Sequence, residues 1–286
     1  MPREPDLDIF LSTWSNDPLP WIGIALATGA YLAGVWLVDR AHPATHVPRW
    51  RIAVWLAGLA VIAVALASAV DVYAESLFAV HMVQHLLLAM VAPPLLALGA
   101  PITLALRVSG PGVRHRRLLP MLHSRIARVV ASPLVAWSAI TVAMWFTHFS
   151  PLYNAALEDP GLHVAEHAIF LGTGLLFWWA AVAADPRPRR LDYGVRLALV
   201  GLQMPVNAVV GLAIYFAPTV LYPHYAAGAR AWGRDPLTDQ QIGGVIMWGV
   251  GDLLLLATFL AIVVAWMRAD ERRSRLRDGR RRPYRT

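Results

Sequence analysis

Seven long apolar runs dominate this chain and limit what it can fold into. Each approaches the length that an α-helix needs to cross a bilayer, about 20 residues. The runs lie at 20–38, 52–70, 77–98, 133–149, 162–184, 195–219 and 241–267. Only 15% of the 286 residues are charged, whereas soluble proteins average about 25%. We therefore predict an all-α polytopic membrane protein with seven transmembrane helices.

The predicted membrane domain covers residues 20–267 and stands between two short segments. Residues 1–19 precede it as an extracytoplasmic segment, and residues 268–286 form a basic tail. The sequence contains no evident internal repeat and no long Gly/Ser linker, so we expect one membrane domain. The first run follows the acidic stretch MPREPDLDIF, and we do not expect a cleaved signal peptide.

The connections between the runs alternate in charge. Arginines cluster after the first, third and fifth runs and in the tail, whereas the connections after the second and fourth runs carry only carboxylates. The positive-inside rule then places the N-terminus outside and the C-terminus in the cytoplasm of a multi-pass plasma-membrane protein. Arginines at span ends also account for the net charge of +7 through topology and lipid headgroups, so we expect no nucleic-acid partner.

Three pairs of residues spaced i,i+4 fall at the same predicted depth. His81 and His85 lie in the outer half of the third run, and His163 and His167 open the fifth. Met144 and His148 end the fourth run. Imidazoles inside a membrane are costly unless they are paired or ligated. Two such pairs at matching depth are typical of a metal site between the helices of a bundle.

Copper is the metal that this set of side chains favours. The chain has no cysteine, which excludes thiolate sites and disulfides. Imidazole suits copper, zinc, iron and nickel, whereas thioether sulfur selects Cu(I). We also expect two residues, Glu166 and Gln84, to hydrogen-bond the ligand imidazoles. The predicted ligands are His81, His85, His163, His167, His148, Met144 and Met247.

Other polar or helix-breaking residues interrupt the apolar runs. Gln203 and Asn207 flank Pro205 in the sixth run, and Pro93–Pro94 in the third run predicts a kink. Asp252 lies near the middle of the seventh run, where a structural role and a proton-linked role remain equally open. The segment HVAEH matches the H-x-x-E-H metalloprotease pattern. Since no third ligand follows it, we do not expect proteolysis.

Five segments together resemble the CtaG family of seven-span cytochrome c oxidase assembly factors, of the Bacillus and actinobacterial type. The resemblance runs from Trp14 to Trp266, and the segments are STWSNDPLP, HMVQHLLLAMVAPPLLALGAP, HVAEH, QMPVNAVVG and DQQIGGVIMWG. It implies a non-enzymatic role in maturing haem–copper oxidase through copper handling at the outer face. It also places the family's histidines at His81, His85, His163 and His167, with His148 as a further one.

The resemblance implies cytochrome c oxidase subunits as partners. Some relatives carry a fused copper-transport domain, and for this chain we expect a separate copper donor protein. Two alternatives stay open. Histidines from two helices could ligate haem in an electron-transfer protein, with Gly172 and Gly174 leaving room for the ring. A copper transporter would use Gln203, Asn207 and Asp252 as part of a path, but the inner half of the third run is entirely apolar.

Overall fold

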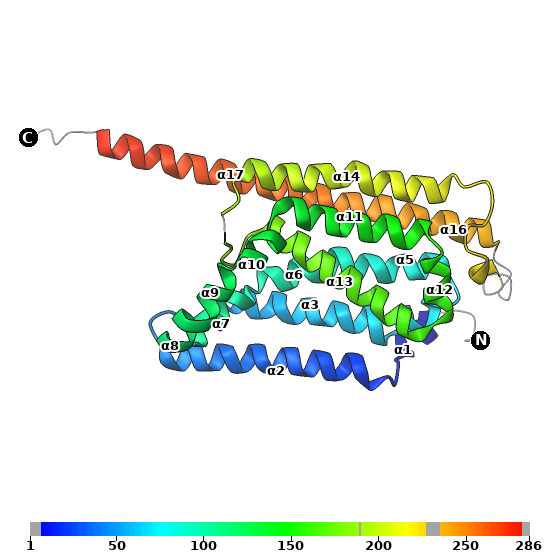
Figure 1. Cartoon of the computed structure of the whole chain (residues 1–286), viewed down its shortest axis with the longest axis horizontal. Helices are drawn as coiled ribbons and strands as arrows, with labels where there is room; N and C mark the ends of the chain where they lie inside the picture. Colours follow the sequence, from blue (N-terminus) through cyan, green and yellow to red (C-terminus); the bar gives the residue numbers. More distant parts are fainter. Residues whose placement is uncertain (1–6, 189, 227–234, 282–286) are drawn as a thin grey trace, which may run out of the picture.

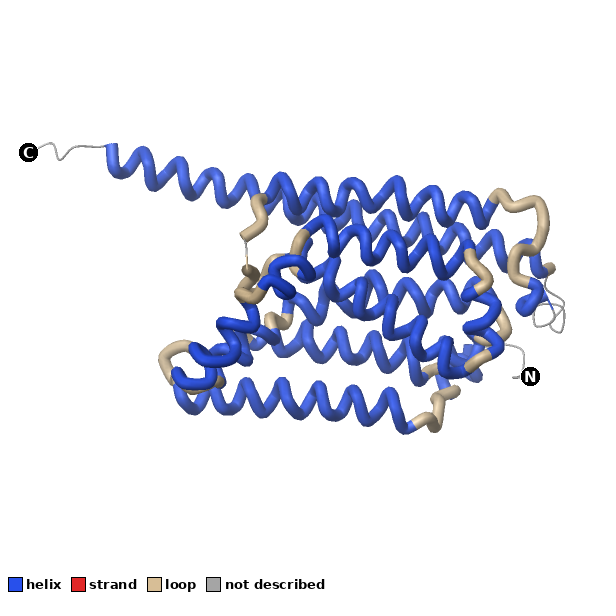
Figure 2. Tube along the Cα trace, viewed as in Figure 1, coloured by secondary structure: helices blue, strands red, loops and turns tan. Residues whose placement is uncertain are grey.

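The computed structural model is helical throughout the residues that it describes, which are 7–188, 190–226 and 235–281. No strand occurs in these ranges (Figure 2). An isolated bridge joins Trp14 to Ser68. Consecutive long helices run antiparallel and form one bundle (Figure 1). The all-α expectation is confirmed.

Each of the seven predicted spans contains a helix. Six are long and apolar enough to cross a membrane, while α11 is a shorter apolar helix of 17 residues. The chain is therefore a multi-pass membrane protein. The long segments are α2 Pro18–Ala41; α3 Arg49–Ala67; α5 Phe78–Leu86 with η1 Leu87–Val91 and α6 Ala92–Leu98; α11 Pro133–Phe149; α13 Pro160–Val182; α14 Tyr193–Tyr215; and α16 Pro236–Val245 with η3 Ile246–Val250 and α17 Gly251–Arg281.

Four of these helices begin with the same local chemistry. A short oxygen-bearing side chain caps the free N–H groups of the first turn, and proline follows as the first helical residue. Proline suits that position because it has no N–H to satisfy and its φ is already helical. The pairs are Asp17–Pro18, Ser132–Pro133, Asp159–Pro160 and Asp235–Pro236.

The third membrane segment is irregular where the sequence predicted a kink. Its first part, α5, passes into one turn of π-helix, η1, directly before Pro93 and Pro94 at the start of α6. Proline cannot donate to the preceding turn, and a wider turn accommodates this loss. The π-turn therefore separates the histidine-bearing part of the segment from its purely apolar part.

Close helix packing fixes η1 against α13. A Cβ added to Gly174 would lie 2.7 Å from the Ala89 carbonyl oxygen and 3.0 Å from Pro93. The Trp178 indole N–H donates to the same carbonyl at 2.9 Å. Glycine at this position lets the two backbones approach, and the indole satisfies a carbonyl of the π-turn. Gly172 has open space around it.

The seventh segment also packs closely against its neighbour. A Cβ on Gly211 of α14 would lie 2.8 Å from the carbonyl oxygen of Gly244 in α16. In the middle of these segments the Asn207 amide donates to Asp252 at 3.0 Å. Asp252 thus has a hydrogen-bond partner inside the bundle.

The connection after the third segment contains short helices that the sequence did not predict. One residue, Asp185, anchors the first of them by accepting hydrogen bonds from the Ile102 and Thr103 N–H groups and from the Thr103 hydroxyl. They are α7 Pro101–Val108, α8 Pro111–Val113, η2 Arg114–Leu118, α9 Leu119–Leu122 and α10 Arg125–Val130. At the opposite end of the bundle lie α1 Leu7–Ser12, α4 Ala69–Ala74 and α12 Leu152–Glu158.

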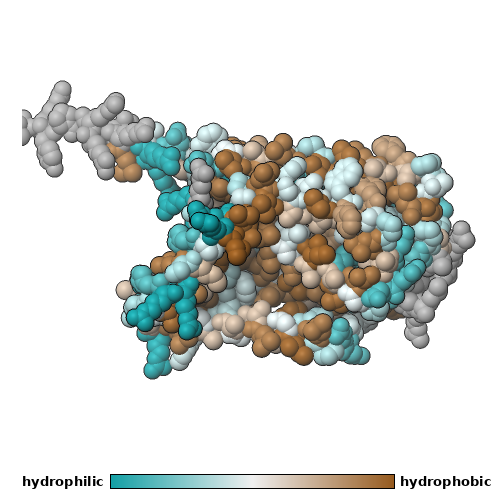
Figure 3. Space-filling model, viewed as in Figure 1, coloured by the Kyte–Doolittle hydropathy of each residue, from teal (hydrophilic) through white to brown (hydrophobic). Residues whose placement is uncertain are grey.

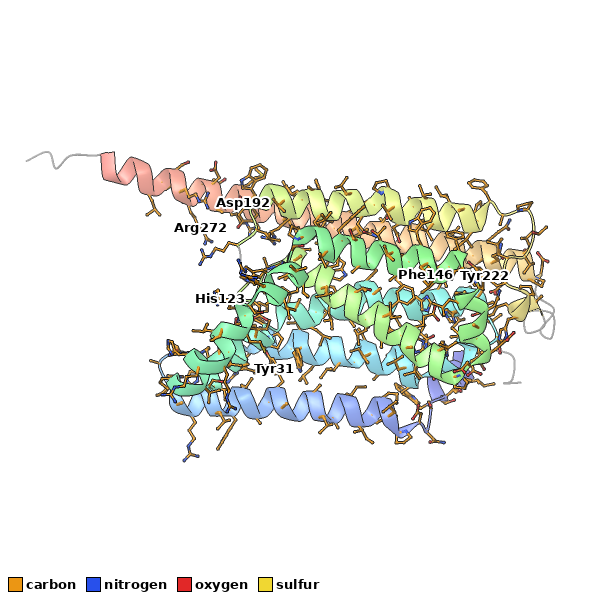
Figure 4. All side chains as sticks on the ribbon, viewed as in Figure 1. Tyr31, His123, Phe146, Asp192, Tyr222 and Arg272 are labelled. Carbon is orange, nitrogen blue, oxygen red and sulfur yellow. The ribbon has the colours of Figure 1, made fainter. Side chains whose placement is uncertain are left out.

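The two ends of the bundle differ in composition. Hydrophilic residues gather on α7–α10 and on α17 beyond the bundle, and apolar residues cover much of the surface between the ends (Figure 3). His123, Asp192 and Arg272 lie at this arginine-rich end, and Phe146 and Tyr222 lie toward the other (Figure 4). The end bearing Tyr222 is called the carboxylate end below, because Asp17, Asp159 and Asp235 cap helices there.

The contact at Gly174 predicts a sharp difference between two neighbouring glycines. Gly174→Ala should lower the free energy of unfolding by roughly 1–3 kcal/mol, the usual cost of overpacking. Gly172→Ala, with nothing near its Cβ, should leave it unchanged or raise it by up to about 1 kcal/mol through better helix propensity. Unfolding in detergent micelles, followed by tryptophan fluorescence, measures both. Equal stability of the two variants would contradict the packing argument.

Candidate metal centre

Histidines from α5, α11 and α13 meet near the carboxylate end of the bundle. His81 and His85 face each other with 2.8 Å between their Nε2 atoms. The Glu166 carboxylate lies beside both, with Oε2 3.9 Å from His81 Nε2 and 3.8 Å from His85 Nε2. All three side chains are buried. The i,i+4 spacing in α5 thus places both rings on one face, as predicted.

The second histidine pair, on α13, lies beside the first. The His163 ring lies parallel to His81 with 5.4 Å between centroids, and His167 lies 6.4 Å from His85. Ligand atoms of His81, His163 and Glu166 lie within 4.8 Å of one another. Ligand atoms on a tetrahedral ion with bonds of about 2.1 Å lie about 3.4 Å apart. The three ligand atoms thus lie farther apart than around a bound ion, and small side-chain shifts would bring them to a single ion.

Several buried polar atoms in this centre have no hydrogen-bond partner in the described part of the chain. They are His85 Nδ1, His148 Nε2, His163 Nε2, His167 Nε2 and both oxygens of Glu166. Buried polar atoms are almost always paired, because an unpaired one loses its bonds to water without replacement. Imidazole nitrogen and carboxylate oxygen are ordinary metal ligands. Glu166, predicted as a hydrogen-bond acceptor for an imidazole, is placed where it could itself be a ligand.

His148 is held in one orientation by its own helix. Its Nδ1–H donates to the Met144 carbonyl oxygen at 2.7 Å, so the proton of the neutral ring is on Nδ1 and the lone pair is on Nε2. The ring centroid lies 5.7 Å from that of His85. His148 therefore lies beside the α5 pair, on α11 of the fourth predicted run.

The predicted methionines lie beside this centre, around a small cavity. Met144 and Met247 line a cavity of about 20 Å³ together with His85 and His148. Two further methionines, at positions 82 and 90, line it as well. Met90 was not among the predicted residues, since it follows the histidines by more than one turn and only η1 brings it to the cavity.

Three tyrosines that were not predicted as site residues lie beside the centre. The Tyr225 hydroxyl lies 2.9 Å from His81 Nδ1 and 3.3 Å from the Tyr153 hydroxyl. The Tyr222 hydroxyl donates to the His148 carbonyl oxygen at 2.9 Å. Burial raises the pKa of Tyr153 and Tyr225 well above 10, so both stay neutral. The sequence signal for them was the segment LYPHYAAG, in which two tyrosines stand beside His224.

Gln84 was predicted to hydrogen-bond an imidazole, but its amide bonds to other groups. Its amide donates to the Ala65 carbonyl oxygen and to Asp71 Oδ1, both at 2.8 Å. These bonds tie α5 to α3 and to α4. Gln84 therefore fixes the helix that carries His81 and His85 instead of bonding either ring.

A pocket of about 880 Å³ leads to the centre between α2, α3 and α13. His163 and His167 line it, and four carboxylates, Asp17, Asp71, Glu75 and Glu158, surround its end near these rings. Its deeper wall is apolar, and the surface above α2 is visibly hollowed (Figure 3). Carboxylates lining such an approach attract cations toward the imidazoles.

Comparison with known proteins gives one family. The family described as cytochrome c oxidase caa3 assembly factor (Caa3_CtaG) matches residues 29–269. Uncharacterized proteins of Mycobacterium bovis and Mycobacterium tuberculosis are each 34% identical over 281 residues, and one of Mycobacterium leprae is 31% identical over 283 residues. The alignments cover 95% of this chain and 42% of each relative, so the chain spans about two-fifths of their length. No solved structure matches the chain.

The carboxyl group of Asp71, which lines the large pocket, makes the stability of the folded protein depend on pH. Burial raises its pKa to about 6, although the hydrogen bond from Gln84 opposes this. The folded protein therefore holds a proton that the unfolded chain releases near pH 4. Stability should fall as the pH rises from about 4 to about 6, because ionised Asp71 is unfavourable only when buried.

Asp71→Asn should remove this part of the pH dependence, and Glu158→Gln, on the exposed rim of the same pocket, should keep it. Thermal unfolding of the detergent-solubilised protein between pH 4 and pH 7 measures both. A slope that survives in the Asp71→Asn protein would assign it to another group.

Proposed function

This chain belongs to the family of cytochrome c oxidase caa3 assembly factors, and on that premise we propose that it binds copper as cargo and delivers it to the apo-oxidase. The ion would be held by His81, His85, His163, His167 and Glu166, with His148 at its edge. The observation that carries the proposal is the group of ligand atoms of His81, His163 and Glu166 within 4.8 Å of one another, beside further buried imidazole nitrogens that have no hydrogen-bond partner in the described residues. A metal ion can accept lone pairs from several imidazole and carboxylate groups at once.

The surrounding side chains favour copper over other metals. The donors are imidazole, carboxylate and nearby thioether, and the sequence contains no cysteine. Thioether sulfur favours Cu(I) over zinc and over hard cations. A donor set without thiolate also suits an ion that must be released, because thiolates hold soft metals most firmly.

The geometry favours a single ion over a porphyrin. The rings of His81 and His163 lie 5.4 Å apart and those of His163 and His167 lie 4.2 Å apart. A macrocycle between ligands would have to separate these rings. Gly174, which the haem alternative required as free space, packs on Ala89 and Pro93 instead.

The proposed topology has seven spans, with the N-terminus outside and the C-terminus in the cytoplasm of the plasma membrane. The 17 residues of α11 are at the short end of the range that spans a bilayer, about 17–25 residues. Arginine-rich segments gather at one end of the bundle (Figure 4), as the positive-inside rule requires of a cytoplasmic face. The metal centre then lies near the outer face, reached through the acidic end of the large pocket.

In this role the protein is a carrier and not an enzyme. We propose that a separate donor protein supplies copper at the outer face and that an oxidase subunit receives it. The pocket lined by His163 and His167 would be the route of exchange, since it joins the centre to the carboxylate end.

Elemental analysis of the purified protein, expressed with added copper, tests the proposal. We expect near-stoichiometric copper in the wild type, and a loss of at least about 100-fold in copper affinity when His81 and His85 are both changed to alanine, since even groups that only orient ligands contribute about 10–100-fold. Oxidase maturation in cells carrying this variant should fall in parallel. Iron with a Soret band would identify haem instead.

A matched control is available at the arginine-rich end. His115 and His123 are exposed histidines whose Nδ1–H groups donate to the carbonyl four residues earlier, as in His148. Their double alanine variant should keep copper and oxidase maturation at wild-type levels. Wild-type protein without copper, or an unaffected His81/His85 double variant, would refute the proposal.

A further inference from the structure

The small cavity beside the metal centre, called the thioether cavity below, has an unusual lining. Its volume of about 20 Å³ is enough for one water-sized body. Four of the chain's eight methionines line it. They come from three separate membrane segments: Met82 from α5 and Met90 from η1 of the third, Met144 from α11, and Met247 from η3. All four are buried.

Packing alone would account for one or two methionines, because Met readily fills irregular gaps. It does not account for His148, whose ring lines the same cavity with a buried Nε2 that has no partner. Since Nδ1 is bonded back to its own helix, Nε2 is on the side of the ring away from that helix. A water there would need two to four polar partners, and most of the lining is apolar or thioether.

Two polar residues of the sixth segment hold the methionines in place. The Gln203 amide lies 3.8 Å from the Met144 sulfur as a donor, and the Asn207 amide donates to the Met247 carbonyl oxygen at 3.0 Å. Gln203 and Asn207 are spaced i,i+4, so both face the same side of α14. This arrangement gives the intramembrane pair in the QMPVN motif a role: each residue positions one methionine.

We propose that the thioether cavity is a Cu(I) site of its own, separate from the His/Glu centre, with ligands drawn from the four methionine sulfurs and His148 Nε2. The proposal rests on the proposed function, because it assumes that the chain carries copper. Neutral soft donors suit a monovalent soft cation. Because these donors are neutral, a site occupied by Cu(I) buries one net positive charge, whereas a site occupied by a divalent cation would bury two.

His85 connects the two sites. Its Nε2 faces His81 and Glu166, and its ring also lines the thioether cavity. A cuprous ion could therefore pass from the His/Glu centre into the cavity past a single imidazole, without entering water. The deeper site would hold the ion away from oxidants and from water at the mouth of the large pocket.

Silver binding separates the two sites experimentally, because Ag(I) is a redox-inert probe for Cu(I) sites. We expect the double variant Met144→Leu/Met247→Leu to lose at least about 100-fold in Ag(I) affinity at this site, while Zn(II) binding at the His/Glu centre stays at the wild-type level. Leucine conserves the volume of methionine, so the fold is retained. Met204→Leu, on α14 but outside the cavity lining, is the control and should bind Ag(I) normally.

A second measurement does not depend on any variant. X-ray absorption at the copper edge of the Cu(I)-loaded wild-type protein should show sulfur neighbours, which only methionine can supply in this chain. Purely nitrogen and oxygen neighbours, or unchanged Ag(I) affinity in the double leucine variant, would overturn the thioether site while leaving a copper-binding His/Glu centre intact. Wild-type protein that binds neither copper nor silver would instead refute the proposed function.

Discussion

Polar side chains buried between membrane helices lose the hydrogen bonds of water and are stable there only when other groups replace them. The histidine-rich end of this bundle is organised by that constraint. His81 bonds to Tyr225 and to His85, and the Nδ1 of His148 bonds to its own helix. His85 Nδ1, His148 Nε2, His163 Nε2, His167 Nε2 and both Glu166 oxygens have no hydrogen-bond partner in the described part of the chain. Cations held by these atoms would replace the missing hydrogen bonds, and α5, α11 and α13 all contribute to the set.

Irregular helix geometry supports this arrangement. The π-turns η1 and η3 each carry one of the clustered methionines, Met90 and Met247. A π-turn widens the helix and shifts the residues that follow it around the axis, which is why such turns recur at functional sites. Gly174 allows α13 to pack directly on η1, and Trp178 bonds to the Ala89 carbonyl there. The packing of α13 on η1 thus helps to fix the positions of the histidines that precede η1 in α5.

The length of the apolar runs was sufficient to predict the seven long helical segments, and the residue spacing was sufficient to predict the histidine pairs, because both are local properties of the sequence. The i,i+4 rule places His81 with His85 and His163 with His167 whatever the tertiary structure. The partners of Gln84, the tyrosines over His81 and the contribution of Met90 depend on which helices become neighbours and on the π-turn, and no local pattern encodes these. The helices of residues 101–130 were missed because Asp185, far along the chain, anchors the first of them.

The hydrogen bond between His81 and Tyr225 links the centre to the connection between α14 and α16. An imidazole can offer Nε2 to a cation only if its proton is on Nδ1. His81 must then donate to the Tyr225 hydroxyl, which in turn is free to donate toward Tyr153. When instead the proton is on His81 Nε2, bridging to His85, the tyrosine must donate to His81. A metal ion on His81 Nε2 would therefore fix the direction of the Tyr225–Tyr153 hydroxyl pair, which joins the connection between α14 and α16 to α12.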